Sequence, residues 1–144
     1  MIAVSGSGIA GLAAALAVLR NQKPLLLVAG QTPATTLQGG VQIAPNGWAA
    51  LDQLGLGDAA RARATKLQAI TVRDMRSTAT LASLDLSASP YASLSRAVLA
   101  SLLKAEISAA SGMTHIAANI THLVQRGPDQ GKALHMLTDD GDRH

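Results

Sequence analysis

The chain has 144 residues, a net charge of +3 and no cysteine, which is enough for one ordinary domain with a core of its own. The lack of cysteine excludes disulfides and thiolate metal sites, and no carboxylate stands at ligand spacing from the histidines, which argues against a metal site. Trp48 and Tyr91 are the only aromatic residues, so the scattered basic residues favour a solvated face over a nucleic-acid surface.

The N-terminal segment predicts a strand, a glycine-rich turn, a helix and a second strand, over residues 2–4, 6–11, 9–21 and 25–28. The turn matches the pattern G-x-G-x-x-G between a strand and a helix, where the pattern carries most information. In it the first glycine allows a sharp turn, the second allows a pyrophosphate to approach, and the third lets the helix pack closely. The start of the helix favours phosphate charge. The sequence therefore predicts a dinucleotide-binding βαβ unit.

The middle of the chain predicts two helices and a hairpin. A helix begins at Pro45, and a short helix over 58–65 follows with Asp58 as its N-cap. Apolar and polar residues alternate over 67–75 and 78–86, which predicts an antiparallel hairpin with one exposed face.

The last third predicts an amphipathic helix over 95–111, ended by Gly112. A third parallel strand follows over 114–117, and residues 119–125 and 132–138 predict a second hairpin. The expected fold class is α/β: a Rossmann-like βαβ domain, with a parallel sheet covered by helices on both faces and a small antiparallel β excursion. The apolar stretch of the first helix is too short to span a membrane and no basic residue precedes it, which favours a cytoplasmic protein.

Four segments resemble a known family: GSGIAGLAAAL at 6–16, GGVQIAPNGWAAL at 39–51, LSRAVL at 94–99 and LTDDG at 137–141. Together they are similar to FAD-dependent aromatic-ring monooxygenases of the para-hydroxybenzoate and salicylate hydroxylase type. The second segment is the most discriminating, because ordinary NAD dehydrogenases have nothing like it.

The resemblance implies FAD as cofactor and, in the complete enzyme, NAD(P)H and O2 as co-substrates and a small aromatic substrate. It implies that the glycine turn faces the FAD pyrophosphate, that Arg96 contacts FAD, that the backbone of Ile120 borders the adenine, and that Val41 and Gln42 pass near the flavin ring. The full set of cofactor-binding candidates is Gly6, Ser7, Gly8, Ile9, Ala10, Gly11, Ala29, Gly30, Gln31, Val41, Gln42, Arg96 and Ile120. No catalytic residue is identified.

The chain departs from the family at the end of the second strand. The family has a glutamate there that holds the adenosine ribose, whereas this chain has Ala29, and no acidic residue occurs before Asp52. Loss of that acceptor lowers affinity by about tenfold or more. Gln31 is a weak substitute. No arginine stands nearby, so nothing supports a site for the 2′-phosphate of NADP.

The chain also stops at His144, where members of the family continue through a Gly-Asp flavin motif and most of a substrate-binding sheet. The expected organisation is one incomplete FAD-binding domain over 1–144, with 67–92 an excursion toward a substrate domain, inactive as this fragment alone. One alternative is a truncated, non-catalytic nucleotide-binding remnant, whose unpaired sheet edge would allow self-association. Another is an NAD-dependent Rossmann oxidoreductase, which the missing acidic residue and segment 39–51 disfavour.

Overall fold

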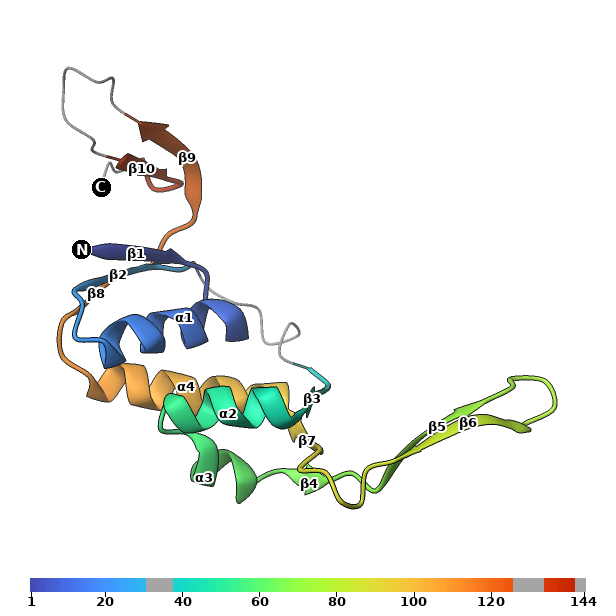
Figure 1. Cartoon of the computed structure of the whole chain (residues 1–144). Helices are drawn as coiled ribbons and strands as arrows, with labels where there is room; N and C mark the ends of the chain where they lie inside the picture. Colours follow the sequence, from blue (N-terminus) through green and yellow to red (C-terminus); the bar gives the residue numbers. More distant parts are fainter. Residues whose placement is uncertain (31–37, 126–133, 142–144) are drawn as a thin grey trace. The chain divides into compact units, whose positions relative to one another are not determined.

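A computed structural model describes residues 1–30, 38–125 and 134–141. The chain divides into two compact units (Figure 1). The first unit combines Met1–Thr36 with Leu103–His144, and the second is Leu37–Leu102. Among the described residues, no helix is both long and apolar enough to cross a membrane.

The first unit is built on a parallel sheet in the order β1-β2-β8. Its strands are β1 (Ile2–Ser5), β2 (Leu25–Val28) and β8 (Met113–Ile116), and α1 (Ile9–Arg20) connects the first two. All four residues of β2 are buried, because a central parallel strand is covered on both faces and paired on both edges. The predicted βαβ unit and third parallel strand are both confirmed.

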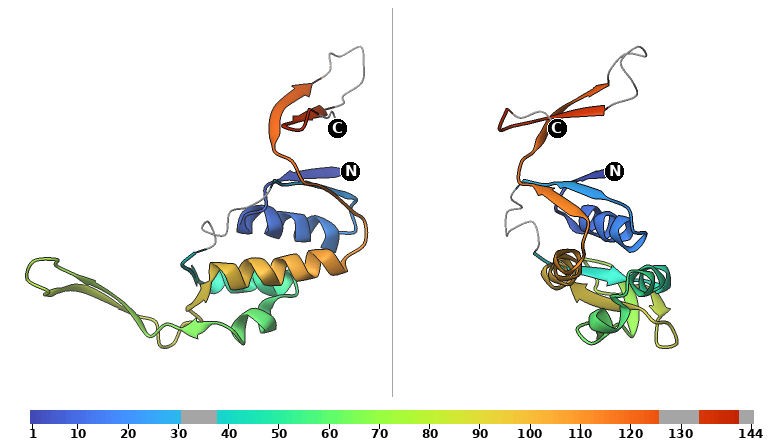
Figure 2. Two further views of the ribbon diagram at one scale, coloured as in Figure 1. Left: turned by 180° about the vertical axis from the view of Figure 1, so that it is seen from behind. Right: turned by 90° about the vertical axis from the view of Figure 1, so that its left-hand side faces the viewer.

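The two faces of this sheet are covered by different kinds of element. On one face, Leu26 and Val28 pack with Met136, which belongs to a hairpin of β9 (Ile120–Gln125) and β10 (Leu134–Thr138). Figure 2 shows this hairpin on the side of the sheet opposite to α1. Among the described residues, the prediction of helices on both faces was wrong, because the chain leaving β8 pairs with itself as a hairpin on this face and forms no helix there. The hairpin itself is confirmed; its connecting loop lies outside the described residues.

The second unit contains a small antiparallel sheet in the order β3-β7-β4 and two helices. Its elements are β3 (Gly40–Ile43), α2 (Pro45–Gln53), α3 (Gly57–Arg61), β4 (Thr65–Lys66) and β7 (Ala92–Ser95). Ile43, Trp48 and Leu94 are among its buried side chains. The prediction of Asp58 as an N-cap was wrong: Leu56 is the N-cap and Asp58 lies in the first turn of α3.

The second unit also contains a hairpin, formed by β5 (Ala69–Arg73) and β6 (Thr80–Asp85). The antiparallel pairing is as predicted. The expectation of a single exposed face was wrong, since Val72 is 52% and Leu84 58% exposed on the side where apolar residues pair.

Helix α4 (Arg96–Ala109) begins in the second unit and ends in the first. The prediction of 95–111 is therefore right to within two residues. Gly112 follows with a φ of +86°, a left-handed conformation that suits glycine at the end of a helix. Its carbonyl accepts a 3.0 Å hydrogen bond from the N–H of Leu25, which ties the chain after α4 to the start of β2.

Candidate nucleotide-binding site

The glycine turn between β1 and α1 has a different constraint at each glycine. Gly6 has a φ of +113°, which residues with a Cβ rarely adopt. A Cβ on Gly11 would lie 2.9 Å from the carbonyl carbon of Gly6 and closer still to its oxygen, so only glycine lets α1 pack against the turn. A Cβ on Gly8 would meet no atom within 4 Å. The turn is therefore tight on its inner side and open beside Gly8.

The start of α1 has backbone N–H donors that no side chain caps among the residues that the structure describes. Gly8 is the N-cap and provides no side-chain cap, and the first turn contains no acidic residue. The N–H groups of a first helical turn have no acceptor within their own helix, and the helix dipole adds partial positive charge at the same place. This end of α1 is suited to an anion that approaches over Gly8.

The ends of β1 and β2 are joined next to this turn. The N–H of Gly6 donates to the carbonyl of Val28 at 2.9 Å, and the Ser7 hydroxyl donates to the carbonyl of Gly30 at 3.4 Å. Ala29 lies between them and is buried, 7% exposed. Gln31, the other candidate at this strand end, lies outside the described residues.

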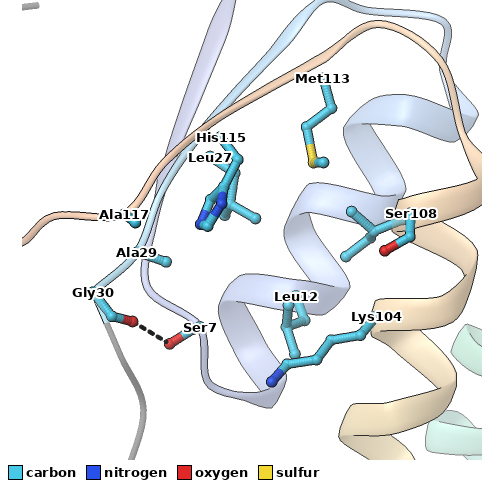
Figure 3. Close-up of a pocket in the computed structure, with 11 residues that line it drawn as sticks. Ser7, Leu12, Leu27, Ala29, Gly30, Lys104, Ser108, Met113, His115 and Ala117 are labelled. Carbon is cyan, nitrogen blue, oxygen red and sulfur yellow. Dashed lines mark hydrogen bonds between the residues drawn. The ribbon is translucent and has the colours of Figure 1, made fainter.

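A cavity of about 330 Å³ lies next to this strand end, between the sheet, α1 and the last part of α4. Figure 3 shows the side chains of Leu27, Met113 and His115 pointing into it. Its polar groups come from Ser7, Lys104, Ser108 and His115, and none of its lining residues is a carboxylate; the remaining lining residues are Leu12, Ala29, Gly30, Ile107 and Ala117. The cavity is mostly apolar, with its cationic group supplied by Lys104.

The opposite side of the strand end carries a polar pair that the sequence did not indicate. The carboxylate of Asp139 accepts from the backbone N–H of Asn119 at 2.9 Å and from its Nδ2 at 2.7 Å. These hydrogen bonds, the backbone one first, hold the pKa of Asp139 below its usual range. Asp139 is not among the cofactor-binding candidates predicted from the sequence. The register of the hairpin explains the pair. Thr138 pairs with Ile120, so the next residues outward, Asn119 and Asp139, become neighbours.

The remaining candidates lie in the second unit. β3 carries Val41 and Gln42, and it pairs with β7 immediately before Arg96. The N–H of Arg96 donates to the carbonyl of Gly39 at 3.0 Å, so these three candidates share one corner of that unit. Ile120, Ala29, Gly30 and the glycine turn belong to the first unit. A single site that contains both groups therefore stays a prediction.

The second unit also has a hollow of about 450 Å³ lined by Trp48, Arg61 and Lys66. The guanidinium of Arg61 forms two 2.7 Å hydrogen bonds with the carboxylate of Asp52. It also lies 5.0 Å from the centre of the Trp48 ring, within the range of a cation–π contact. The Arg61 hydrogen bonds lower the pKa of Asp52. In the part of the chain that the structure describes, no three His, Asp or Glu side chains are grouped to hold a metal ion.

Comparison with known proteins connects this geometry to an enzyme class. No protein-family model matches the chain. It is 39% identical over 105 residues to 3-amino-4-hydroxybenzoate 2-monooxygenase PtnB3 of Streptomyces platensis, covering 68% of this chain and 26% of that protein. It is 30% identical over 141 residues to 3-hydroxybenzoate 6-hydroxylase 1 of Aquipseudomonas alcaligenes, covering 92% of this chain and 36% of that protein.

Solved structures agree at the level of the fold. p-Nitrophenol 4-monooxygenase PnpA from Pseudomonas putida DLL-E4 matches with a TM-score of 0.78 and 19% identity, over 99% of this chain and 37% of that one. HpxO of Klebsiella pneumoniae, solved with FAD and uric acid, matches with a TM-score of 0.75 and 20% identity, over 99% of this chain and 36% of that one.

The chain thus has the Rossmann-like FAD-binding fold of flavin-dependent monooxygenases. More narrowly, its relatives by sequence are hydroxylases of aromatic rings, which confirms the predicted resemblance to that family. The chain spans 26% and 36% of the lengths of the two relatives described above.

Proposed function

We propose that this chain is the FAD-binding part of a flavoprotein monooxygenase that hydroxylates a small aromatic substrate with NAD(P)H and O2. The observation on which the proposal rests is the N-terminal end of α1. Its uncapped N–H groups stand beside a glycine with free space around it, which is the arrangement that binds a pyrophosphate. The sequence relatives are named as aromatic-ring monooxygenases and hydroxylases. Two solved structures with the same fold, HpxO and PieE, were obtained with FAD bound, and this supports the choice of FAD over NAD.

The residues present fit the cofactor at its phosphate end. The backbone N–H groups from Ser7 to Gly11 would hold the pyrophosphate, and the backbone of Ile120 would border the adenine. Arg96 would add a fixed positive charge, which suits a phosphate. Ala29 offers no acceptor to the ribose, so we expect weaker binding than a glutamate at this position would give.

Bound FAD supplies the redox chemistry of hydroxylation. The residues of this chain bind and orient its adenosine diphosphate half. Among the described residues we identify no side chain placed to act as a general acid or base on a substrate. We therefore expect the 144-residue chain to bind FAD without hydroxylating a substrate by itself.

Titration of the purified chain with FAD tests the proposal. Flavin absorbance and fluorescence report binding, and the emission of Trp48, the only tryptophan, gives a second signal. We expect saturable binding in the micromolar to high-micromolar range, with riboflavin, which has no phosphate, binding more weakly. Displacement of FAD by ADP would locate binding at the glycine turn. If no FAD binds at high micromolar concentration, or if NAD binds more tightly than FAD, the proposal is wrong.

A further inference from the structure

The end of β2 lacks a carboxylate in its own sequence, but the fold brings one to it from elsewhere in the chain. In dinucleotide-binding folds an acidic residue about 20 positions after the glycine turn usually holds the ribose hydroxyls. The chain has Ala29 and Gly30 in this region. Asn119 lies against Gly30, and the carboxylate of Asp139 holds Asn119.

The contact between Asn119 and Gly30 leaves no room for a Cβ at position 30 unless the Asn119 side chain moves. A Cβ on Gly30 would lie 2.8 Å from both Cγ and Nδ2 of Asn119, and nearer still to Oδ1. The Asn119 amide group therefore rests directly on the backbone at the end of β2. The same Gly30 accepts the hydrogen bond from Ser7 of the glycine turn, so this amide lies one residue away from the candidate phosphate site.

Asp139 determines how the amide is turned. Its carboxylate is ionised at neutral pH and can only accept hydrogen bonds, so it must face the Nδ2 of Asn119, at 2.7 Å. A second bond to the backbone N–H of Asn119, at 2.9 Å, and a return bond from the Asp139 N–H to the Asn119 carbonyl, also 2.9 Å, make the pair rigid. Oδ1, the Asn119 atom nearest the Gly30 position, is then the acceptor presented at this edge. The negative charge behind the amide strengthens that acceptor.

We infer that Asn119 Oδ1, oriented by Asp139, accepts a hydrogen bond from the adenosine end of the bound dinucleotide and replaces the acceptor that Ala29 lacks. The inference rests on the proposed function, because it presumes a dinucleotide on the glycine turn. The donor is a ribose hydroxyl or the amino group of adenine. Asn119 is thus a binding residue, and Asp139 is a positioning residue that acts through it.

Three nucleotides test the inference: ADP, 2′-deoxy-ADP, which lacks a ribose hydroxyl, and inosine diphosphate, which lacks the amino group. Affinities are measured by calorimetry or NMR titration with the full chain. The wild type should prefer ADP over one of the two analogues by about 5- to 10-fold, the value of one hydrogen bond. In Asn119→Ala this preference should disappear, and ADP should bind as weakly as that analogue. Asp139→Asn should reduce the preference in part, since it replaces one of the two carboxylate oxygens that accept hydrogen bonds from Asn119, one from its Nδ2 and one from its backbone N–H.

Asn46→Ala is the matched control, because Asn46 is an exposed asparagine on α2 of the second unit, and it should leave all three affinities unchanged. Thermal melting of each variant checks that the fold persists. A structural defect would weaken the binding of all three nucleotides, whereas loss of the Asn119 hydrogen bond removes only the preference for ADP. If wild type binds FAD and ADP but Asn119→Ala keeps the preference, the inference is overturned and the proposed function stands. If wild type binds neither FAD nor ADP, both are overturned.

Discussion

Alanine substitution at two glycines three positions apart should separate a packing role from a binding role. Gly11 lies inside α1 against the backbone of Gly6, whereas Gly8 stands at the N-cap with open space beside it. Both changes add the same methyl group to the same turn. We expect Gly11→Ala to lose stability and Gly8→Ala to lose affinity for FAD.

The magnitudes follow from the surroundings of each added methyl. At Gly11 it would lie 2.9 Å from the carbonyl carbon of Gly6, a main-chain atom that cannot rotate away, so overpacking costs about 3 kcal/mol. Replacing glycine by alanine inside a helix returns about 1 kcal/mol, which leaves a net loss of about 2 kcal/mol. Gly8 has a φ of −73°, which alanine adopts readily. There the weaker cap and the smaller entropy of the unfolded chain nearly cancel, to within about 0.5 kcal/mol.

Urea unfolding at neutral pH measures the first effect, and FAD titration measures the second. Gly8→Ala should weaken FAD binding by about tenfold or more, because its methyl occupies the path of the pyrophosphate. Two results would refute the reasoning: an equal loss of stability in both variants, or unchanged FAD affinity in Gly8→Ala. The first would mean that α1 is not packed on the turn, and the second that the phosphate lies elsewhere.

Three further changes test other parts of the molecule. Ala29→Glu restores an acceptor beside the roughly 330 Å³ cavity and should tighten FAD binding by about tenfold; an unchanged affinity in the titration would contradict the placement of the adenosine at this strand end. Gly112→Ala forces a Cβ into a φ of +86° and should lower the free energy of unfolding by about 1 kcal/mol in urea; no loss would mean that α4 ends differently. Arg61→Met removes the hydrogen bonds that lower the pKa of Asp52. The folded pKa lies below the unfolded one, so the pair stabilises above the unfolded pKa and this contribution disappears as the pH falls through the folded value. The difference in unfolding free energy between wild type and Arg61→Met should therefore shrink from about pH 6 to about pH 3, and a difference independent of pH would show that the ion pair is not its source.

The sequence by itself determined the N-terminal βαβ unit and most of the separate elements. The helix over Ile9–Arg20 and the buried strand over Leu25–Val28 follow from local patterns: a run of apolar residues, helical spacing and glycines at fixed offsets. Those patterns depend on residues close together in the chain. The error at Asp58 also has a local cause, since α3 begins at Gly57, two residues earlier than a capping aspartate at position 58 would require.

Only the tertiary structure decided which elements cover the sheet and which side chains meet at its edge. Nothing local to Leu26 and Val28 indicates that Met136 packs on them, and nothing local to Gly30 indicates that Asn119 and Asp139 lie there. These contacts depend on the register of β9 against β10 and on how the chain returns to the sheet after long intervals. Whether residues far apart in the chain come into contact depends on topology and on the entropy of loop closure. The periodicity of a single segment contains no information about either.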